Sequence, residues 1–244
     1  MKNYKFDRPL VEGIIIERQH SFIMLVEYNG KIERCHCPCI SSIGHIELAG
    51  RPCLLWDSQN PRRKTRYTVK AVSLNKPEDK RKKWIGIDQM ESNRYVEHFL
   101  NQNAFKEMLD TQGLEILHEQ TLGESRLDFK VGDTYIENKT ILRMDMPIPD
   151  YIKTKKRGKL KLSDHFYKHI NELKNALNEH ERAILLATFL YDYGYLMGHE
   201  SERGADKGNQ IEKAMNRGVE SWQVNFIVTP IEVKFGHLYK IGEN

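Results

Sequence analysis

The sequence contains no hydrophobic run long enough to cross a membrane as a helix. Such a helix needs about 18 or more apolar residues, and the longest apolar run here spans only residues 183–190. Residues 1–7 contain no apolar core of the kind that a secretory signal peptide carries. We therefore expect a cytoplasmic protein without a membrane partner.

Motifs for nucleotide hydrolysis and for serine-hydrolase chemistry are also missing. The chain has no Gly-x-x-x-x-Gly-Lys loop to hold phosphates. It has no Gly-x-Ser-x-Gly segment to expose a serine nucleophile. A P-loop nucleotide hydrolase and an α/β-hydrolase therefore have no support.

Cysteine is scarce and confined to one segment, because all four cysteines lie between residues 35 and 53. They cannot form a disulfide framework for the whole chain. Cys35, Cys37 and Cys39 alternate, so on a strand they would share one face and, with Cys53, could surround Zn²⁺ or an iron–sulfur cluster. Zinc sites usually leave about two to four residues between the first two ligands, and Cys-x-Cys is tighter. Buried or reactive thiols in a reducing compartment are therefore favoured.

Positive charge is modest overall but clustered. The net charge is +4 and the isoelectric point is near 8.7, while residues 62–70 and 153–161 contain no acid. Clustered cations that contact phosphates supply the salt-dependent part of nucleic-acid affinity, although a solvated loop is the other interpretation. The cations are Arg62, Arg63, Lys64, Arg66 and Lys70 in the first run, and Lys153, Lys155, Lys156, Arg157, Lys159 and Lys161 in the second.

Residues 125–139 are the most informative stretch, because they predict a hairpin that gathers charge on one face. Gly132-Asp133 between two alternating runs is typical of a two-residue hairpin loop. Counting back from this loop places Asp128 opposite Glu137, and Arg126 opposite Lys139. The other face is expected to hold the apolar side chains Leu127, Phe129, Val131 and Ile136.

Two carboxylates directly across from each other cost stability in an ordinary sheet. A hard divalent cation such as Mg²⁺ would offset that cost, because it binds one or two carboxylates and fills its remaining positions with water and phosphate. Lys139 points to the same side as Glu137. A metal-bound water with an ammonium beside it suits phosphodiester hydrolysis. A solvated, charged outer face is the alternative interpretation of Asp128 and Glu137.

From residue 11 to residue 74, five short strand candidates alternate with turn residues. Five strands without a long helix indicate an OB barrel, although an SH3-like barrel fits the count too. Tyr28, Trp56 and Tyr67 either stack nucleic-acid bases on its open face or belong to its core. The strand candidates are residues 11–17, 22–28, 31–37, 51–57 and 65–74.

A polar, lysine-rich stretch at residues 75–83 is typical of a linker, so the 244 residues divide into domains 1–83 and 84–244. In the second domain, alternating helix and strand patterns predict a mixed sheet with helices on its faces. The fold class is therefore α+β or α/β, with a five-stranded OB-like barrel before the mixed sheet. The expected elements are helices at 91–109, 163–178 and 209–217, and strands around 114–116, 183–190, 224–228 and 231–235, besides the hairpin.

Asp128 followed by Glu137-x-Lys139 resembles the PD-(D/E)xK nuclease signature. Six segments resemble, in this order, the sugar fermentation stimulation protein family: residues 51–55, 60–67, 93–97, 124–129, 135–139 and 217–220. The resemblance implies an N-terminal OB-type barrel that binds nucleic acid and a C-terminal PD-(D/E)xK nuclease-like domain in a bacterial protein.

Two features depart from the family pattern. Residues 37–44 replace the usual Cys and Asn-Thr-Gly turn, which puts any role of that turn in doubt. Asn138 stands where an apolar residue is commoner. Only its backbone carbonyl is expected to approach the metal, so Asn138 need not abolish activity.

The resemblance and the hairpin predict Asp128, Glu137 and Lys139 as catalytic residues, with Mg²⁺ or Mn²⁺ as the cofactor. Glu97 is a further candidate ligand, because a helix carboxylate ahead of the hairpin often completes the metal site in related nucleases. A surface position is its alternative. Related nucleases also present a polar residue to phosphate on the helix after the hairpin. The expected nucleic-acid contacts are Arg62, Arg63, Lys64, Arg66, Arg126, Lys168 and His169.

The expected function is that of a DNA-binding, metal-dependent nuclease-like protein. The alternative is a non-catalytic DNA-binding regulator of sugar or maltose metabolism with a vestigial nuclease fold. The intact Asp/Glu/Lys set favours the enzyme, because a retired site gains nothing from holding two carboxylates together. DNA is favoured over RNA as the partner. The mode of cleavage and the oligomeric state, a homodimer included, are open.

Overall fold

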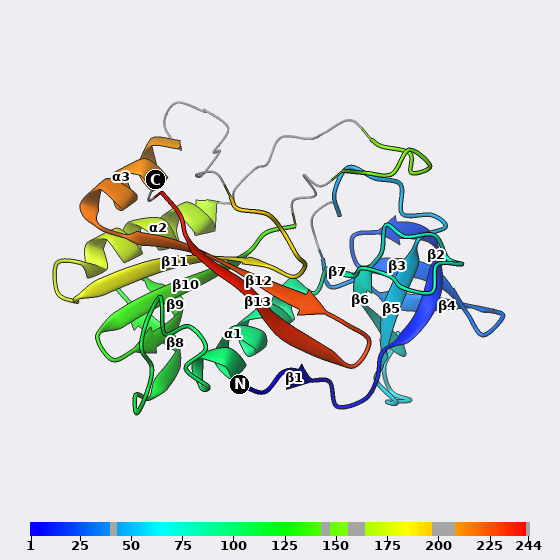
Figure 1. Cartoon of the computed structure of the whole chain (residues 1–244), viewed down its shortest axis with the longest axis horizontal. Helices are drawn as coiled ribbons and strands as arrows, with labels where there is room; N and C mark the ends of the chain where they lie inside the picture. Colours follow the sequence, from blue (N-terminus) through cyan, green and yellow to red (C-terminus); the bar gives the residue numbers. More distant parts are fainter. Residues whose placement is uncertain (40–42, 143–146, 156–163, 197–207, 243–244) are drawn as a thin grey trace.

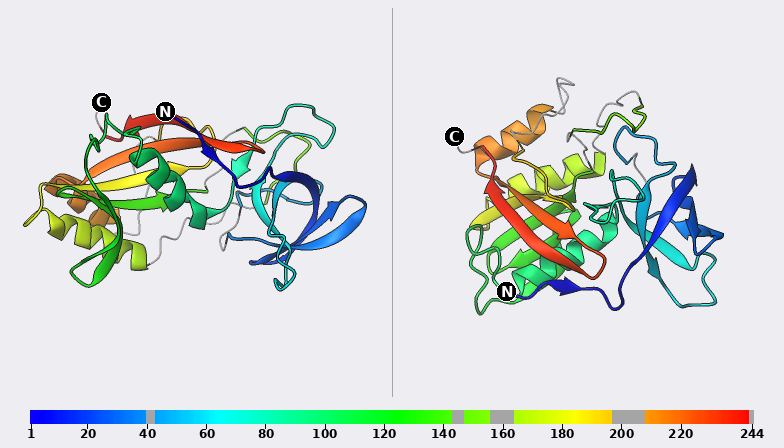
Figure 2. Two further views of the ribbon diagram at one scale, coloured as in Figure 1. Left: turned by 90° about the horizontal axis from the view of Figure 1, so that it is seen from below. Right: turned by 45° about the vertical axis from the view of Figure 1, so that its right-hand side comes forward.

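A computed structural model of the chain describes residues 1–39, 43–142, 147–155, 164–196 and 208–242. It consists of a small barrel and a larger curled sheet with helices, which lie side by side along the long axis of the molecule (Figures 1 and 2). No helix in these ranges is long and apolar enough to cross a membrane.

The N-terminal barrel confirms the predicted OB-like fold. Its strands run in the order β4-β3-β2-β5-β6-β7, and β4 also meets β6 at His36 and Thr68, which closes the barrel. The β3–β4 turn uses Asn29 and Gly30 with φ of 51° and 70°, values that favour an Asn-Gly pair. The strands are β2 (Val11–His20), β3 (Ile23–Tyr28), β4 (Lys31–His36), β5 (Pro52–Asp57), β6 (Tyr67–Val72) and β7 (Ile85–Gly86).

The four cysteines lie in the barrel core, and the described residues hold no disulfide. Burial raises the pKa of Cys35 to about 12 and also raises the pKa values of Cys37 and Cys53. A thiol with a raised pKa is a poor nucleophile at neutral pH. The prediction of buried thiols is therefore confirmed, and they serve as apolar packing groups.

The C-terminal sheet has the order β1-β13-β12-β11-β10-β9-β8, as expected for a mixed sheet. β11 is central and pairs in parallel with both β10 and β12. Its strands are β1 (Tyr4–Lys5), β8 (Ile116–Leu122), β9 (Ser125–Val131), β10 (Thr134–Thr140), β11 (Arg182–Phe189), β12 (Glu220–Val228) and β13 (Glu232–Lys240).

Helices cover both faces of this sheet, so β11 is almost completely buried and its sequence is a continuous apolar run. Ile184 and Leu186 pack in the cluster of helix α1 (Ser92–Leu100), which follows the short 3₁₀ helix η1 (Gln89–Glu91). Ala183 and Leu185 pack in the cluster of α2 and α3. These two helices span Asp164–Ala176 and Gly208–Arg217, close to the predicted 163–178 and 209–217.

Two predictions in the C-terminal part need correction. The helix expected at 91–109 ends at Leu100, and turns follow it. Asn103 has φ of 54°, a left-handed conformation that cannot continue a helix. Leu127 packs in the α2–α3 cluster, whereas Phe129, Val131 and Ile136 pack in the α1 cluster. The β9–β10 pairing ends at Ile136 and Phe129, and the β8–β9 pairing is interrupted between Phe129 and Leu127, where Glu119 on β8 has φ of 46°. This irregularity breaks the side-chain alternation before Leu127.

The two parts are interlocked rather than joined by a simple linker. β1 pairs with β13 at the edge of the C-terminal sheet, while β7 pairs with β6 of the barrel (Figure 1). Gly86 in β7 donates to the Leu190 carbonyl at 2.8 Å, and a Cβ on Gly86 would lie 2.5 Å from Leu190 Cβ. A division between residues 83 and 84 therefore does not match the packing. β1 precedes this boundary but belongs to the C-terminal sheet, and β7 follows it but belongs to the barrel sheet.

Candidate functional site

The β9–β10 hairpin brings the predicted carboxylates together. The expected two-residue loop is confirmed, because Val131 pairs with Thr134 and the register continues to Phe129 and Ile136. Gly132 has φ of 55°, which suits glycine at this turn. The next residue on each strand is Asp128 or Glu137.

Asp128 is partly buried and held from two sides. Its Oδ1 accepts a hydrogen bond from Asn93 Nδ2 on α1 at 2.7 Å, and its Oδ2 accepts one from the Asn138 backbone at 2.8 Å. Burial raises the pKa of Asp128, although these hydrogen bonds oppose the rise. The two bonds fix the carboxylate between the hairpin and α1.

Glu137 is buried, with only 6% of its surface exposed. Its Oε1 lies 2.5 Å from His169 Nδ1, while its Oε2 has no hydrogen-bond partner among the described residues. Burial raises the pKa of Glu137, and the Asp128 charge adds to the rise. The hydrogen bond with Glu137 raises the pKa of His169 in turn.

The two carboxyl groups are neighbours, and the Asp128 charge is one cause of the raised pKa of Glu137. Two carboxylates cannot donate to each other and repel when both are charged, so a shared proton or a cation between them would stabilise the pair. The unpartnered Glu137 Oε2 is a hard oxygen donor and fits a divalent cation. The described residues contain no larger His, Cys, Asp or Glu group arranged for a metal. A cation held here would therefore take its remaining ligands from water and substrate.

Asn138 has a structural role that the sequence did not reveal. It alternates with Glu137 on β10, so its side chain faces α1, where its Nδ2 donates to Asn93 Oδ1 at 2.7 Å and to Ser92 Oγ at 3.1 Å. Thr188 Oγ1 donates to Asn138 Oδ1 at 2.5 Å. Because Nδ2 of Asn138 occupies the Asn93 oxygen, the Asn93 amide presents its NH₂ group to Asp128. Asn138 is thus a positioning residue for the carboxylate pair.

Replacing Asn138 with leucine is expected to weaken the site and the fold together. Leucine would leave buried polar groups of Ser92, Asn93 and Thr188 without a partner, which costs about 1–3 kcal/mol. The loss of an outer partner of a ligand typically lowers metal affinity about 10- to 100-fold. Thermal unfolding and calorimetry with Mn²⁺ measure these effects. Unchanged stability and unchanged affinity would show that the network does not position Asp128.

Lys139 lies on the same face as Glu137, as predicted. Its Nζ is 5.5 Å from the centre of the Phe166 ring on α2, and it forms no ion pair with any described residue. The ammonium group is therefore held beside the carboxylates by an aromatic contact and is available to an anion. His165 lies one helical turn before His169 on α2, and their ring centroids are 4.1 Å apart. This i, i+4 histidine pair was overlooked in the sequence, and it supports the orientation of His169.

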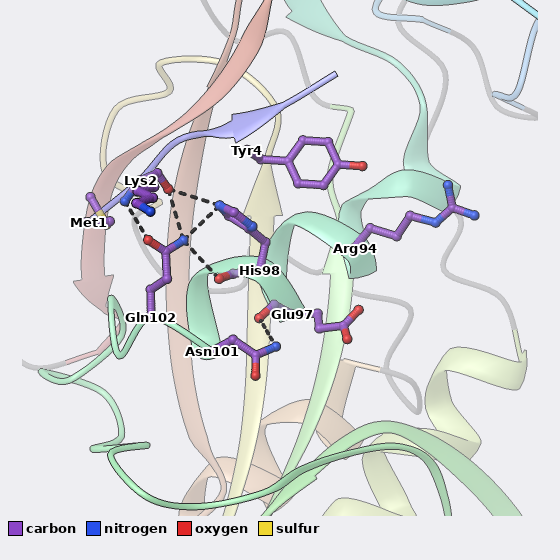
Figure 3. A pocket seen from close by; sticks show the side chains of 8 residues that line it. All are labelled: Met1, Lys2, Tyr4, Arg94, Glu97, His98, Asn101 and Gln102. Atoms are coloured by element: carbon purple, nitrogen blue, oxygen red, sulfur yellow. Dashed lines mark hydrogen bonds between the residues drawn. The ribbon is translucent and has the colours of Figure 1, made fainter. Parts of the chain in front are cut away.

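Glu97 is not brought to the carboxylate pair. Its Oε1 lies 2.9 Å from His118 Nε2, and both side chains are substantially exposed. Glu97 lines a surface cavity of about 820 Å³ between α1 and the N-terminal residues, with Tyr4 and Arg94 (Figure 3). Asn93, one helical turn earlier, is the α1 residue that contacts Asp128. The helix contributes to the site through an amide rather than the expected carboxylate.

The predicted nucleic-acid contacts lie in the loop between β5 and β6, on strand β9 and on helix α2. The loop between β5 and β6 exposes Arg62 and Lys64, while Arg63 is partly buried and Arg66 forms a two-bond ion pair with Asp57. Lys156–Lys161 of the second basic run, like the Ser163 helix start, lie outside the described residues.

The remaining predicted contacts differ in their exposure. Arg126 pairs with Glu119 at 3.2 Å and Lys168 pairs with Glu124 at 3.2 Å, all four with exposed side chains. His169 differs from the expectation, because it is buried against Glu137 rather than presented to solvent.

The aromatic candidates for base stacking separate into two kinds. Tyr67 is buried and meets Tyr28 edge to face, with ring centroids 5.5 Å apart. These two rings therefore pack in or against the barrel core. Trp56 is partly buried and lines a cavity at the junction of the two parts.

A closed five-stranded barrel followed by a curled mixed sheet with helices defines an OB-type protein with an appended α/β domain. Residues 16–87 match the family described as the SfsA N-terminal OB domain, and residues 90–232 match the sugar fermentation stimulation protein RE domain. The chain belongs to the sugar fermentation stimulation protein family.

Relatives support this assignment along the whole chain. A sugar fermentation stimulation protein homolog of Trichodesmium erythraeum is 31% identical, with 96% of this chain and 91% of the relative covered. A homolog of Alcanivorax borkumensis is 28% identical, with 88% and 90% covered. The fold also matches the solved structure of Pyrococcus furiosus SfsA in complex with Ca²⁺, with a TM-score of 0.72, 20% identity and complete coverage of both chains.

Proposed function

We propose that this protein is a divalent-metal-dependent nuclease in which Asp128 and Glu137 hold Mg²⁺ or Mn²⁺. The observation that carries the proposal is the buried Oε2 of Glu137, which has no partner among the described residues and belongs to a side chain whose pKa is raised by burial and by the Asp128 charge. The related Pyrococcus furiosus SfsA is described in complex with Ca²⁺. Ca²⁺ and Mg²⁺ both prefer oxygen ligands.

Each residue has a distinct part in the proposed reaction. A bound divalent ion would supply acidification of a water molecule and polarisation of the phosphate. Asp128 and Glu137 orient that ion, and His169 fixes the rotamer of Glu137 through Oε1. Lys139 offsets the negative charge that develops on the phosphate. Arg62, Arg63 and Lys64 of the barrel loop would contact the phosphates of DNA.

The test is incubation of the purified protein with plasmid DNA, linear duplex DNA, single-stranded DNA and RNA, with Mg²⁺, Mn²⁺ or EDTA. Metal-dependent cleavage that is lost in Glu137→Gln supports the proposal and identifies the substrate. Arg62→Gln is a comparison variant: it removes one proposed phosphate contact but leaves the hairpin intact, so it should weaken cleavage without abolishing it. Intact nucleic acid in every reaction with the unmutated protein would reject the nuclease function.

Metal affinity is expected to increase with pH. The pKa values of Asp128 and Glu137 are raised, chiefly by burial, so protons remain on the pair at a higher pH than on ordinary carboxyl groups. A cation must displace these protons, and its affinity therefore falls as the pH falls through the raised pKa values. Calorimetry in two buffers of different ionisation enthalpy would detect proton release. Identical heats in both buffers would contradict a shared proton.

The second candidate is a non-catalytic DNA-binding regulator that retains the nuclease fold. It is favoured by the pairing of Glu137 Oε1 with His169, which leaves fewer carboxylate oxygens for a cation. This function predicts salt-sensitive DNA binding that is lost when Arg62, Arg63 and Lys64 are replaced and is unchanged in Glu137→Gln. Filter binding with and without Mg²⁺ distinguishes it from the nuclease.

A further inference from the structure

A cavity of about 500 Å³ lies at the junction of the barrel, the N-terminal segment and the start of the second domain. This volume falls within the range of about 300–1,000 Å³ that is usual for small-ligand sites. Its walls combine aromatic rings with charged groups from both parts of the chain. The residues used below are Trp56, Arg63, Thr68, Lys70, Asp88 and Glu91, all of which line it.

Trp56 forms one aromatic wall of this cavity, together with Tyr4 and Phe6, and three cations lie near its ring. Arg8, Arg63 and Lys70 lie 5.9, 5.7 and 5.6 Å from the ring centre. The indole Nε1 donates to Asp7 Oδ1 at 2.8 Å, which fixes the orientation of the ring. A fixed indole of this kind is a platform for a flat, electron-deficient or cationic group.

Most of the charges in the cavity neutralise each other, and Arg63 is the exception. Lys70 Nζ lies 2.6 Å from Asp88 Oδ2 and 3.3 Å from Glu91 Oε1. Arg63 donates only to the neutral hydroxyl of Thr68, at 3.2 Å, and has no ion pair with a described residue. Replacing that one neutral hydrogen bond with a contact to phosphate would be favourable. Arg63 is therefore the cation that an anionic ligand would meet.

Asp88 provides a second unsatisfied group. The residue is only 5% exposed, and its Oδ1 is buried without a hydrogen-bond partner among the described residues. A buried acceptor without a donor costs free energy until a donor arrives. Oδ2 already accepts a hydrogen bond from Lys70, so Oδ1 is the Asp88 oxygen left for one N–H group, and a ligand in the cavity would have to displace the side chains that cover it.

We propose that this cavity holds one unpaired nucleotide of a single-stranded nucleic acid. The base stacks on Trp56 in place of the Arg63 guanidinium, an exocyclic amine donates to Asp88 Oδ1, and Arg63 binds the adjacent phosphate. Cytosine, adenine and guanine offer such an amine, whereas thymine has no exocyclic amine and its one ring N–H lies between two carbonyl groups that a carboxylate repels. This inference deepens the proposed function, since it assumes that the protein binds nucleic acid, and it assigns the barrel junction to single strands.

Trp56 itself reports on the proposed site. The other two tryptophans, Trp84 and Trp222, are each only 8% exposed, so a base that quenches fluorescence would act mainly on Trp56. The experiment titrates the full-length protein in EDTA with dC, dA and dT oligonucleotides, a duplex, and nucleoside monophosphates. Anisotropy of labelled oligonucleotides gives the affinities of Trp56→Ala, Trp56→Phe and Arg63→Gln. Arg62→Gln is the matched control for loss of charge in the same loop.

The expected result is quenching by dC and dA oligonucleotides, weaker binding of dT, and no quenching by the duplex. Trp56→Ala should bind about 5- to 150-fold more weakly, the usual effect of removing one stacking ring. Trp56→Phe keeps a ring and should lose less affinity. Arg63→Gln should lose more affinity than Arg62→Gln. Circular dichroism verifies that each variant is folded.

Three results would overturn the proposal. One is equal affinity of dC and dT, another is equal loss in the two arginine variants, and the third is unchanged affinity in a folded Trp56→Ala protein. Tight binding of monophosphates, equal to that of oligonucleotides, would assign the cavity to a free nucleotide instead. The quenching experiment runs in EDTA, where no metal-dependent cleavage occurs, so it does not depend on the nuclease test. Base-dependent quenching without cleavage would support the cavity but reject the nuclease, and cleavage without quenching would do the reverse.

Discussion

Replacing Glu137 with glutamine is expected to abolish cleavage while making the metal-free protein more stable. Cleavage should fall by more than about 100-fold, because outer partners of a ligand alone contribute about 10- to 100-fold. The melting temperature in EDTA should rise by about 2–10 °C, as one unsatisfied buried group gains a partner. Plasmid cleavage and thermal unfolding measure the two effects on one preparation.

The stabilisation follows from the hydrogen-bond geometry. Oε1 of Glu137 accepts a hydrogen bond from His169 Nδ1, and Oε2 is buried without a donor among the described residues. A glutamine at this position keeps its carbonyl for His169 and turns its NH₂ toward the Asp128 carboxylate. It also removes one of two adjacent buried acids, whose repulsion contributes to the raised pKa of Glu137. Native proteins often sacrifice stability in this way at functional sites.

Glu137→Ala is the matched control, because it removes the acid but supplies no donor. This variant leaves the buried His169 without its partner and opens a cavity beside Asp128, so it should lose cleavage and also lose stability. A Glu137→Gln protein that melts at the same temperature as, or below, the unmutated protein would contradict the geometry. Retained cleavage in either variant would show that Glu137 is not a ligand.

Replacing Lys139 with alanine is expected to lower cleavage about 100- to 1,000-fold, the typical effect of losing one preorganised group that stabilises transition-state charge. The fold should tolerate this change, because the Phe166 contact is worth no more than about 1 kcal/mol. Metal affinity should be nearly unchanged or slightly higher, because a neighbouring positive charge is removed. Single-turnover cleavage and Mn²⁺ calorimetry separate these two quantities.

The control for Lys139 is Lys168→Ala, which removes an equal charge from an exposed side chain on α2. A loss below about tenfold in Lys168→Ala, beside the large loss in Lys139→Ala, would assign the effect to position rather than to net charge. Comparable losses in the two variants would instead indicate long-range attraction of DNA.

The sequence predicts those parts of the structure that depend on neighbouring residues. Gly132-Asp133 and Asn29-Gly30 specify their turns locally, and the resulting register brings Asp128 near Glu137. The apolar run at 183–190 indicates a strand covered on both faces, which β11 confirms.

Contacts between distant elements are less visible in the sequence. Side-chain periodicity cannot tell which helix covers a face, so the pairing of His169 with Glu137 was missed. The amide network of Asn138 with Asn93 and Thr188 joins three elements, and each member looks like an ordinary polar residue. Glu97 shows the converse error, because a plausible spacing on α1 points it at His118 rather than at the hairpin.

The exchange of β1 and β7 between the two sheets fixes the distance between the barrel and the hairpin, which matters for the long substrate of the proposed function. If a flexible linker joined the barrel to the C-terminal sheet, the barrel would move relative to the hairpin. A substrate bound to the barrel would then reach the hairpin at many different distances. Here the apolar cores meet across the junction, with Phe189 and Tyr191 packed in the barrel cluster and Leu54 in the α1 cluster. The two parts therefore keep one fixed separation, and under the proposed function a nucleic-acid strand bound at the barrel would reach the hairpin at a single distance.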